Sequence, residues 1–320
     1  MEKESLFLGI EIGGSKLQLV KGNADGAALA THRFPVRKEE GAAGIRRNIE
    51  KTIHEHFREG VAAVGIGFGG PVNWKTGQIA ASFHIEGWSD FNLVKWLEPI
   101  VEAPVFVDND ANTAALGEAV HGAGKDYSSV LYITIGSGIG GGLVIHHDIF
   151  HGAIPGETEI GHLRMDRSGD ILESRCSGWA VDRKIREIVA REPDGVLAKL
   201  TAGHHAGEAR FLKTALDQQD AAAWKLFNEL TDDFAFGLSH AVNLLHPEII
   251  ILGGGISLIG ELWREHIEKK LAPYIMKAFY PGPLIRLAAL EEQAVTVGAL
   301  ALARERFFRR QNILNHNYKE

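Results

Sequence analysis

The chain has 320 residues, 45% of them hydrophobic and 23% charged, so it can build real cores and is not a disordered protein. This length predicts two domains, or one large domain with a cleft. The net charge of -7 comes with acidic and basic residues interspersed, which gives no basic surface for nucleic acid. The single cysteine, Cys176, excludes an intramolecular disulfide and a cysteine-rich structural zinc site.

The N-terminal residues lead directly into an apolar strand, without the basic head and apolar stretch of a signal peptide. No apolar run approaches the roughly 20 residues that a membrane helix needs. We therefore expect a cytoplasmic protein with no membrane partner.

The first predicted elements form a β-hairpin with a glycine turn. Residues 6–12 are a β-rich apolar run, Gly13 and Gly14 interrupt it, and residues 16–20 alternate with the period of a strand. The next expected elements are a third strand after the turn at 23–26, a helix over 43–57, a buried strand over 62–68, a loop with Trp74 and Trp88, and a strand over 104–107.

The same pattern then repeats. Residues 129–135 form an apolar run that glycines at 136–142 interrupt, and residues 143–145 continue as a strand. Two such hairpins, each followed by α/β structure, predict two similar domains that face each other across a cleft. The remaining expected elements are a long helix over 227–245, a strand over 249–252 that ends in glycines 253–255, a strand near 284–290, and a helix from about Ala294.

The glycine clusters have two interpretations. Residues 65–70 and 136–141 both match Gly-x-Gly-x-x-Gly, but neither opens a helix, so neither is a dinucleotide-binding fingerprint. Glycine turns can still bring backbone N–H groups close to a phosphate, or they can simply make tight hairpins. Three separate clusters at the ends of apolar strands favour nucleotide binding.

The stretch Asp108-Asn109-Asp110 joins a short strand to an Ala-rich helix. A carboxylate at the carboxyl end of a strand in an open α/β fold is placed for chemistry, and an Asp there can accept a proton from a substrate hydroxyl. Asn and Asp before a helix are also ordinary N-caps. The two interpretations are compatible, because the cap can aim Asp110, whereas Asp108 is assigned no role.

A second polar group lies at residues 156–162, where Glu157, Glu159 and His162 fall within six positions. His146, His147 and His151 lie nearby, but no recognised metal-ligand spacing is present. Carboxylates and a neutral imidazole suit a polyhydroxylated ligand, since each can share hydrogen bonds with adjacent hydroxyls. Sugar recognition is the better chemical match.

Six segments in order carry a resemblance to a known family. The chain is similar to the repressor/ORF/kinase (ROK) family of bacterial sugar kinases over nearly its whole length. This resemblance implies an α/β, actin-like ATPase or hexokinase-type (ribonuclease H-like) duplicated fold, with two domains around a cleft. It also implies ATP-dependent phosphorylation of a hexose or amino-hexose hydroxyl with Mg²⁺. The segments are Ile12-Gly13-Gly14-Ser15-Lys16, Gly69-Gly70-Pro71-Val72, Asn109-Asp110-Ala111-Asn112, residues 136–142, Glu159-Ile160-Gly161-His162 and Gly253-Gly254-Gly255.

The resemblance assigns roles residue by residue. Asp110 matches the catalytic base. Glu11 stands where many members have an Asp, and its carboxylate is implied to bind Mg²⁺ indirectly. The residues implied to bind sugar are Gly70, Asn109, Glu159, His162 and Glu173. Those implied to bind the nucleotide are Gly13, Gly14, Ser15, Lys16, Gly136, Ser137 and Gly138 at the phosphates, and Gly254 and Gly255 at the adenosine side.

The chain departs from the family pattern in two further ways. The zinc-binding Cys-x-Cys-Gly-x-x-Gly-Cys motif of many members is missing, so we expect no zinc site. Its absence shortens the segment between His162 and Glu173, and the match of both residues to the family's sugar ligands depends on this shorter segment. No helix-turn-helix segment precedes residue 12, so we expect no DNA binding.

Several expectations complete the sequence-based hypothesis. The first domain is expected at 1–117, completed by the C-terminal helix near 300–320, and the second at 118–299. Base rates favour a homodimer. The expected reactive hydroxyl is O6, and the first expectation for the sugar is glucose, with mannose and N-acetylhexosamines as alternatives. ATP is the expected donor, with polyphosphate as the alternative. The alternative function is a non-catalytic sugar-sensing protein that keeps the kinase fold.

Overall fold

The computed structural model describes residues 5–23, 25–57, 60–80, 85–154 and 156–317, and the chain divides into two compact units. Unit 1 consists of residues 1–128, 142–157 and 289–320, and unit 2 of residues 129–141 and 158–288. The expected domain boundary at 117–118 falls inside helix α3 (Asp110–His121), which lies wholly in unit 1. Among the described residues, no helix is both long and apolar enough to cross a membrane.

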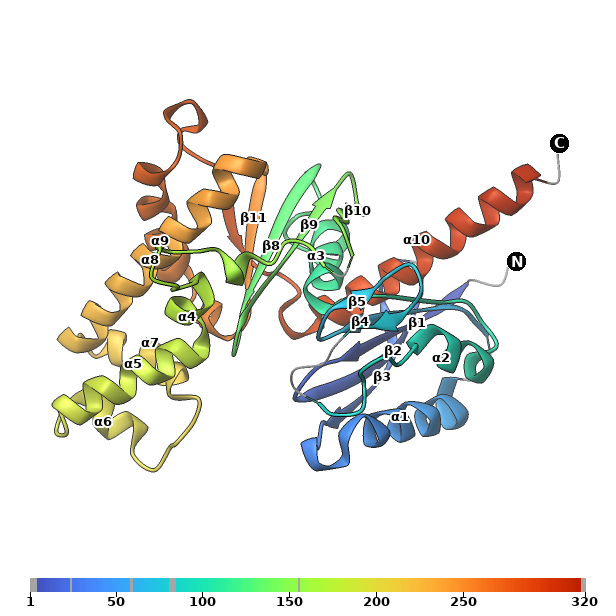
Figure 1. Cartoon of the computed structure of the whole chain (residues 1–320), viewed down its shortest axis with the longest axis horizontal. Coiled ribbons are helices and arrows are strands. Elements are labelled where there is room, and N and C mark those ends of the chain that lie inside the picture. The colour runs from blue at the N-terminus through green and yellow to red at the C-terminus, as the bar shows by residue number, and fades with distance from the viewer. Residues whose placement is uncertain (1–4, 24, 58–59, 81–84, 155, 318–320) are drawn as a thin grey trace. The chain divides into compact units, whose positions relative to one another are not determined.

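Unit 1 is built on a five-stranded sheet in the order β3-β2-β1-β4-β7. Strands β1 to β4 of this sheet are labelled in Figure 1. Strands β1, β2 and β3 pair antiparallel, and β1, β4 and β7 pair parallel. The elements of this unit are β1 (Leu6–Ile12), β2 (Lys16–Gly22), β3 (Ala28–Pro35), α1 (Gly41–Thr52), a π-helical turn (Ile53–Phe57), β4 (Val61–Phe68), β5 (Val72–Asn73), β6 (Gln78–Ile79), α2 (Leu93–Val101), β7 (Val105–Asn109), α3, β10 (Asp148–Ile149) and α10 (Ala294–Asn317).

The two faces of this sheet are covered by different helices. Alternate residues of β1 and β4, such as Ile10 and Ile66, join a large core with α1 and α2, which cover one face. The opposite face carries Phe7 and Ala63, which cluster with Leu300 and Ala303 of α10. The sheet is therefore buried on both sides, as parallel strands usually are.

Glycines allow α10 to approach its face of the sheet closely. A Cβ atom on Gly65 would overlap the backbone carbonyl of Ala299, and one on Gly9 would lie 2.7 Å from the carbonyl oxygen of Thr296. The contact between α3 and α10 is equally close, because a Cβ on Gly298 would overlap the carbonyl of Thr113. The Gly-x-Gly pattern at 65–67 lies within β4 and therefore serves the packing of helices on this strand.

The structure confirms the glycine-turn hairpin of β1 and β2 and corrects one connection. The stretch expected to be a loop between residues 71 and 104 contains the short strands β5 and β6 and the helix α2. Asn92 caps α2, since its side chain accepts from Lys95 N, and Leu93, Leu97 and Val101 bury one face. Pro99 inside the helix obscured this segment in the sequence.

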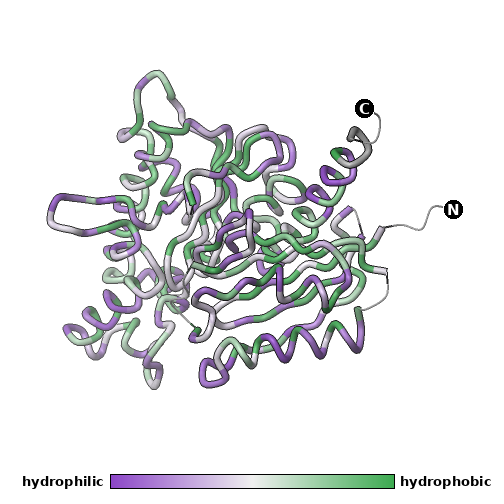
Figure 2. The backbone as a smooth tube through the Cα atoms, turned by 45° about the vertical axis from the view of Figure 1, so that its right-hand side comes forward, coloured by the Kyte–Doolittle hydropathy of each residue, from purple (hydrophilic) through white to green (hydrophobic). Residues whose placement is uncertain are grey.

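Unit 2 carries most of a second five-stranded sheet in the order β10-β9-β8-β11-β12. Strand β11 pairs parallel with both β8 and β12, and the division between units runs through β9. Figure 2 shows hydrophobic residues concentrated along the strands, whereas helices alternate between hydrophobic and hydrophilic positions. The elements here are β8 (Ser129–Ile135), β9 (Ile139–Ile145), α4 (Leu172–Cys176), α5 (Gly178–Arg191), α6 (Val196–Thr201), α7 (Leu212–Asp217), α8 (Ala221–Leu245), β11 (Ile249–Gly253), α9 (Glu261–Leu271) and β12 (Leu284–Leu287).

Candidate active site

The junction of β7 and α3 holds the Asn109-Asp110 pair. Asn109 is the N-cap of α3, and its side-chain oxygen accepts from Ala111 N at 2.8 Å and Asn112 N at 3.3 Å. Its amide nitrogen donates to the carbonyl of Gly70 at 3.3 Å. Asn109 thus fixes the start of the helix and ties it to the segment after β4.

Asp110 is the first residue of α3, and its carboxylate accepts from Ala111 N at 2.9 Å. It lies beside Gly69, where a Cβ atom would be 3.4 Å from the Asp110 Oδ2 atom and 3.3 Å from the carbonyl oxygen of Ile12. The ends of β1 and β4 and the start of α3 therefore meet around Gly69. Burial raises the pKa of Asp110 to about 6, and the charge of Glu11 adds to the rise.

Glu11, near the end of β1, is only 8% exposed. Its Oε2 atom accepts from Gln18 Nε2 at 2.6 Å and forms an ion pair with Lys16 Nζ at 3.2 Å. Burial raises the pKa of Glu11 above its usual value, and Lys16 and Gln18 limit the rise. Oxygen ligands of this kind suit Mg²⁺, so the residue present fits the role that the family resemblance implies.

The turn between β1 and β2 lies next to these groups. Gly13 N donates to the carbonyl of Lys16 at 2.9 Å, which closes the turn, and Ser15 is exposed at its tip. The structure thus brings together Gly13, Gly14, Ser15 and Lys16 with Glu11 and Asp110 near the carboxyl ends of β1 and β4 in the unit 1 sheet.

The corresponding turn of unit 2, at residues 136–138 between β8 and β9, is supported by a carboxylate. Glu173 Oε2 accepts from Ile139 N at 2.8 Å, and a Cβ atom on Gly138 would come within 2.5 Å of it. Gly178 N, at the start of α5, donates to the carbonyl of Gly136 at 2.7 Å. Glu173, predicted to contact sugar, is thus hydrogen-bonded to the predicted phosphate turn.

Glu159 and His162 lie on a tight turn of unit 2. Ile160–His162 form one 3-10 turn, in which His162 N donates to the carbonyl of Glu159 at 3.0 Å. Ile160 is buried, whereas the side chains of Glu159 and His162 are exposed. A Cβ atom on Gly161 would press on the carbonyl of Ile139, so this glycine allows the turn to pack on β9.

Gly254 and Gly255 follow β11. Gly254 has φ +84°, and a Cβ there would lie 2.5 Å from Ile135 N, so no other residue fits without strain. Ser257 Oγ donates to the carbonyl of Gly254 at 2.6 Å, which starts the 3-10 turn Gly255–Ile259. These two glycines come directly after β11, whose last residue, Gly253, pairs with Thr134 of β8, the strand that leads into the 136–138 turn.

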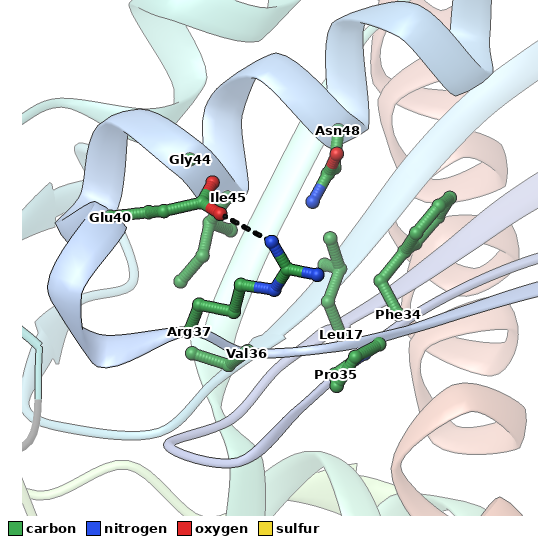
Figure 3. Close-up of a pocket in the computed structure, with 9 residues that line it drawn as sticks. All are labelled: Leu17, Phe34, Pro35, Val36, Arg37, Glu40, Gly44, Ile45 and Asn48. Carbon is green, nitrogen blue, oxygen red and sulfur yellow. Dashed lines mark hydrogen bonds and ion pairs between the residues drawn. The ribbon is translucent and has the colours of Figure 1, made fainter.

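A separate cavity of about 230 Å³ lies in unit 1 between α1 and the ends of β2 and β3, and contains none of the predicted site residues (Figure 3). Arg37 extends into it and pairs with Glu40 at 3.3 Å, and Glu40 also pairs with Arg47 at 3.1 Å. Asn48, Leu17 and Ile45 line the remainder.

Sequence reasoning missed the network around Asp108. Its carboxylate is 2% exposed and lies 2.7 Å from His151 Nε2, 43 residues away, and 3.0 Å from Asn112 Nδ2. No local pattern reveals that pairing. Cys176 is buried and donates to the carbonyl of Leu230, and burial raises the pKa of its thiol, so it is a structural cysteine.

Comparisons with known proteins agree with this arrangement. The model of the ROK family matches residues 7–306, and the chain belongs to this family. The glucokinase of Halalkalibacterium halodurans is 31% identical over 307 residues, which span 91% of this chain and 93% of that protein.

The crystal structure of a ROK family glucokinase from Streptomyces griseus in complex with glucose and AMPPNP is similar over 94% of this chain and 99% of that one, with a TM-score of 0.81 and 31% identity. A putative xylose repressor of Caldicellulosiruptor sp. is 24% identical over 93% of this chain and 77% of the repressor. The fold of this chain is therefore the actin-like ATPase fold of the ROK hexokinases.

Proposed function

We propose that this protein transfers the γ-phosphoryl group of ATP to a hexose hydroxyl, O6 of glucose or of a related sugar, with Asp110 as the general base. The observation that carries the proposal is the junction of β7 and α3. There the Asn109 cap fixes Asp110 beside Gly69, next to the glycine turn of β1 and β2. Glucokinase relatives of similar length at about 30% identity support the reaction class.

Asp110 would accept the proton of the sugar hydroxyl as that oxygen attacks the phosphorus atom. The bond from the hydroxyl oxygen to the γ-phosphorus forms while the bond from that phosphorus to the β,γ-bridging oxygen breaks, and ADP leaves. A carboxylate whose pKa is raised to about 6 is a better proton acceptor than an ordinary Asp and is still mostly ionised at pH 7. Phosphoryl transfer otherwise requires mainly positioning and charge stabilisation.

As the family resemblance implies, we assign sugar binding to Gly70, Asn109, Glu159 and His162. Carboxylate, amide and imidazole groups can each exchange hydrogen bonds with sugar hydroxyls. Asn109 is already fixed by its capping bonds and its contact with Gly70, so its side-chain amide would be held in position before the sugar binds. For Glu173 we propose a role through the 136–138 turn as well as toward the sugar, because its carboxylate bonds to Ile139 N.

The phosphates of ATP are assigned to the two glycine turns, Gly13 to Lys16 and Gly136 to Gly138, and the adenosine to Gly254 and Gly255. A bound Mg²⁺ ion would neutralise part of the negative charge of the phosphates. Glu11 would hold it indirectly, and Lys16, its ion-pair partner, carries the only cationic side chain of the first turn.

The test is a coupled ATPase assay with Mg²⁺ over glucose, mannose, fructose and N-acetylhexosamines, followed by NMR of the product to identify the phosphorylated oxygen. We expect turnover with at least one of these sugars and phosphate at O6. The xylose-repressor relative gives the alternative a basis. Sugar-dependent thermal stabilisation without any phosphoryl transfer would establish the sensor and reject the kinase.

A further inference from the structure

A cluster of an imidazole and two carboxylates lies in unit 1, on residues to which the proposed phosphoryl transfer assigns no role. One ligand atom each from Asp108, His151 and Glu157 lies within 4.8 Å of the others. Asp108 is the last residue of β7 before the Asn109 cap, and His151 and Glu157 come from the segment after β10. We propose that these three side chains bind one divalent transition-metal ion.

The charges of this cluster call for a cation. Asp108 is 2% exposed, the side chain of His151 is 9% exposed, and Glu157 is partly buried. In the part of the chain that the structure describes, neither carboxylate pairs with a lysine or arginine. Their partners are His151, the Asn112 amide, and backbone N–H groups of Asn109 and Gly152. Two neighbouring carboxylates with so little compensation are costly to bury, and a bound cation removes the cost.

Asn112 gives a second, independent indication. It is 3% exposed, and its Nδ2 atom donates to both Asp108 and Glu157, so the amide points into the cluster. Its Oδ1 atom is buried and has no hydrogen-bond partner among the described residues. A buried polar atom without a partner marks a place where a water or an ion belongs. Rotation of the amide would present this oxygen as a fourth ligand.

The geometry needs little adjustment. Metal–ligand bonds of about 2.0–2.2 Å place neighbouring ligand atoms about 3–4 Å apart, so movements of about an ångström complete the site. The His151 ring is already held in orientation, because it stacks on Trp74 with ring centroids 4.1 Å apart. One imidazole nitrogen with two or three oxygens selects Zn²⁺, Mn²⁺ or Co²⁺ over Mg²⁺ and Ca²⁺. No thiolate is required, so the missing cysteines do not bear on this site.

A metal ion at this site would cross-link two segments of unit 1. A metal bound by these residues would join the segment 151–157 to the start of α3. That segment runs directly into Thr158 and the exposed Glu159 turn, and α3 begins with Asp110.

The experiment uses the purified full chain, stripped of metal with a chelator and titrated with Co²⁺ or Zn²⁺ alone, without nucleotide or sugar. We expect one equivalent of Co²⁺ with a d–d absorption band and a rise in melting temperature with Zn²⁺. His151→Ala and Glu157→Gln should each weaken binding at least tenfold and remove the thermal shift. Two variants are used because either alone could perturb folding.

Two matched controls separate this site from others. His147→Ala removes an exposed histidine from the turn before β10 and should bind Co²⁺ like the unmodified chain. Glu11→Gln removes the carboxylate assigned to Mg²⁺ and should do the same. The proposal is overturned if no stoichiometric Co²⁺ binding occurs, if His147→Ala weakens it as much as His151→Ala, or if Glu11→Gln abolishes it. The experiment measures metal binding and not phosphoryl transfer. A failure of the metal-site proposal therefore leaves the kinase proposal standing, and a failure of the kinase proposal leaves the metal-site proposal standing.

Discussion

The two regions that carry the candidate site residues are built differently. In unit 1, Glu11 is buried, Asn109 and Asp110 are partly buried, and each has fixed hydrogen-bond or ion-pair partners. In unit 2, Glu159 and His162 are exposed on a short turn, in which Ile160 is buried and Gly161 packs against Ile139 of β9. Groups that are positioned before the substrate binds cost no reorganisation at the moment of reaction, and exposed groups are accessible to a ligand.

This difference separates catalysis from recognition. Changes at Glu11 or Asp110 of unit 1 should lower kcat, since these two groups are positioned before substrate binds and act on the transferred proton and the phosphate charge. Changes in the unit 2 region should raise KM for the sugar, because they remove contacts that form in both the ground state and the transition state.

The largest effect is expected for Asp110→Asn. We expect kcat to fall by about 10²- to 10⁴-fold, because the amide cannot accept the hydroxyl proton. The dissociation constant for sugar, measured by calorimetry, should change little. Asp126→Asn, at an exposed carboxylate, is the matched control. A rate within threefold of the unmodified enzyme would remove Asp110 from the mechanism.

Next is Glu159→Gln in the exposed turn. Loss of hydrogen bonds to a charged group, each worth about 1.5–3 kcal/mol, should raise KM for the sugar roughly 10- to 100-fold with kcat nearly unchanged. Initial rates over a range of sugar concentrations measure both constants, with Glu192→Gln as an exposed control. If kcat falls and KM does not, the division between the two regions is wrong.

A third change affects the packing of α10 against the sheet of unit 1. Gly65→Ala would force α10 away from β4, because the new Cβ overlaps the carbonyl of Ala299. We expect a loss of about 1–3 kcal/mol in the free energy of unfolding. Gly195→Ala, in extended backbone at the start of α6, should cost less than about 1 kcal/mol. Urea denaturation of both variants makes the comparison, and equal losses would contradict the close approach of α10.

The smallest effect concerns Glu305 of α10. Burial raises the pKa of this carboxyl from 4.5 to about 7, with Asp148 adding to the rise and Arg309 opposing it. Because the folded-state pKa is raised, its stabilising contribution is complete below pH 4.5 and is lost as the pH rises through 7. Glu305→Gln should therefore melt at a higher temperature than the unmodified chain at pH 7.5 but not at pH 5. Calorimetry that finds the same difference at both values would refute this, and enzyme activity should not change.

The parts of the fold that depend on local pattern were predictable. Apolar alternation and paired glycines indicated both hairpins, and the Asn109 cap followed from an Asn placed before an Ala-rich helix. Helix α2 was missed because Pro99 interrupts its pattern.

Contacts between distant segments were not predictable. Gly65 and Gly67 look like half of a nucleotide motif, but they are explained by close contacts with α10, more than 200 residues later, and in the case of Gly67 also with Thr113 of α3. The Asp108–His151 pair and the bond of Glu173 to the 136–138 turn likewise join segments whose local sequences contain no sign of the partner. The resemblance to a family identified Asp110, Glu159 and His162 as candidates, but their burial and partners required the structure.

The packing of α10 on the unit 1 sheet also has a consequence for biosynthesis. The ribosome releases the chain from its N-terminal side, so β1, β4 and α3 emerge before unit 2, but α10, which covers Gly9 and Gly65, comes after unit 2 in the chain. Every residue of unit 2 has been synthesised by residue 288, before α10 begins at Ala294. Unit 1, which begins before unit 2, is therefore completed after it, and until α10 emerges the face of its sheet that carries Gly9 and Gly65 lacks its covering helix.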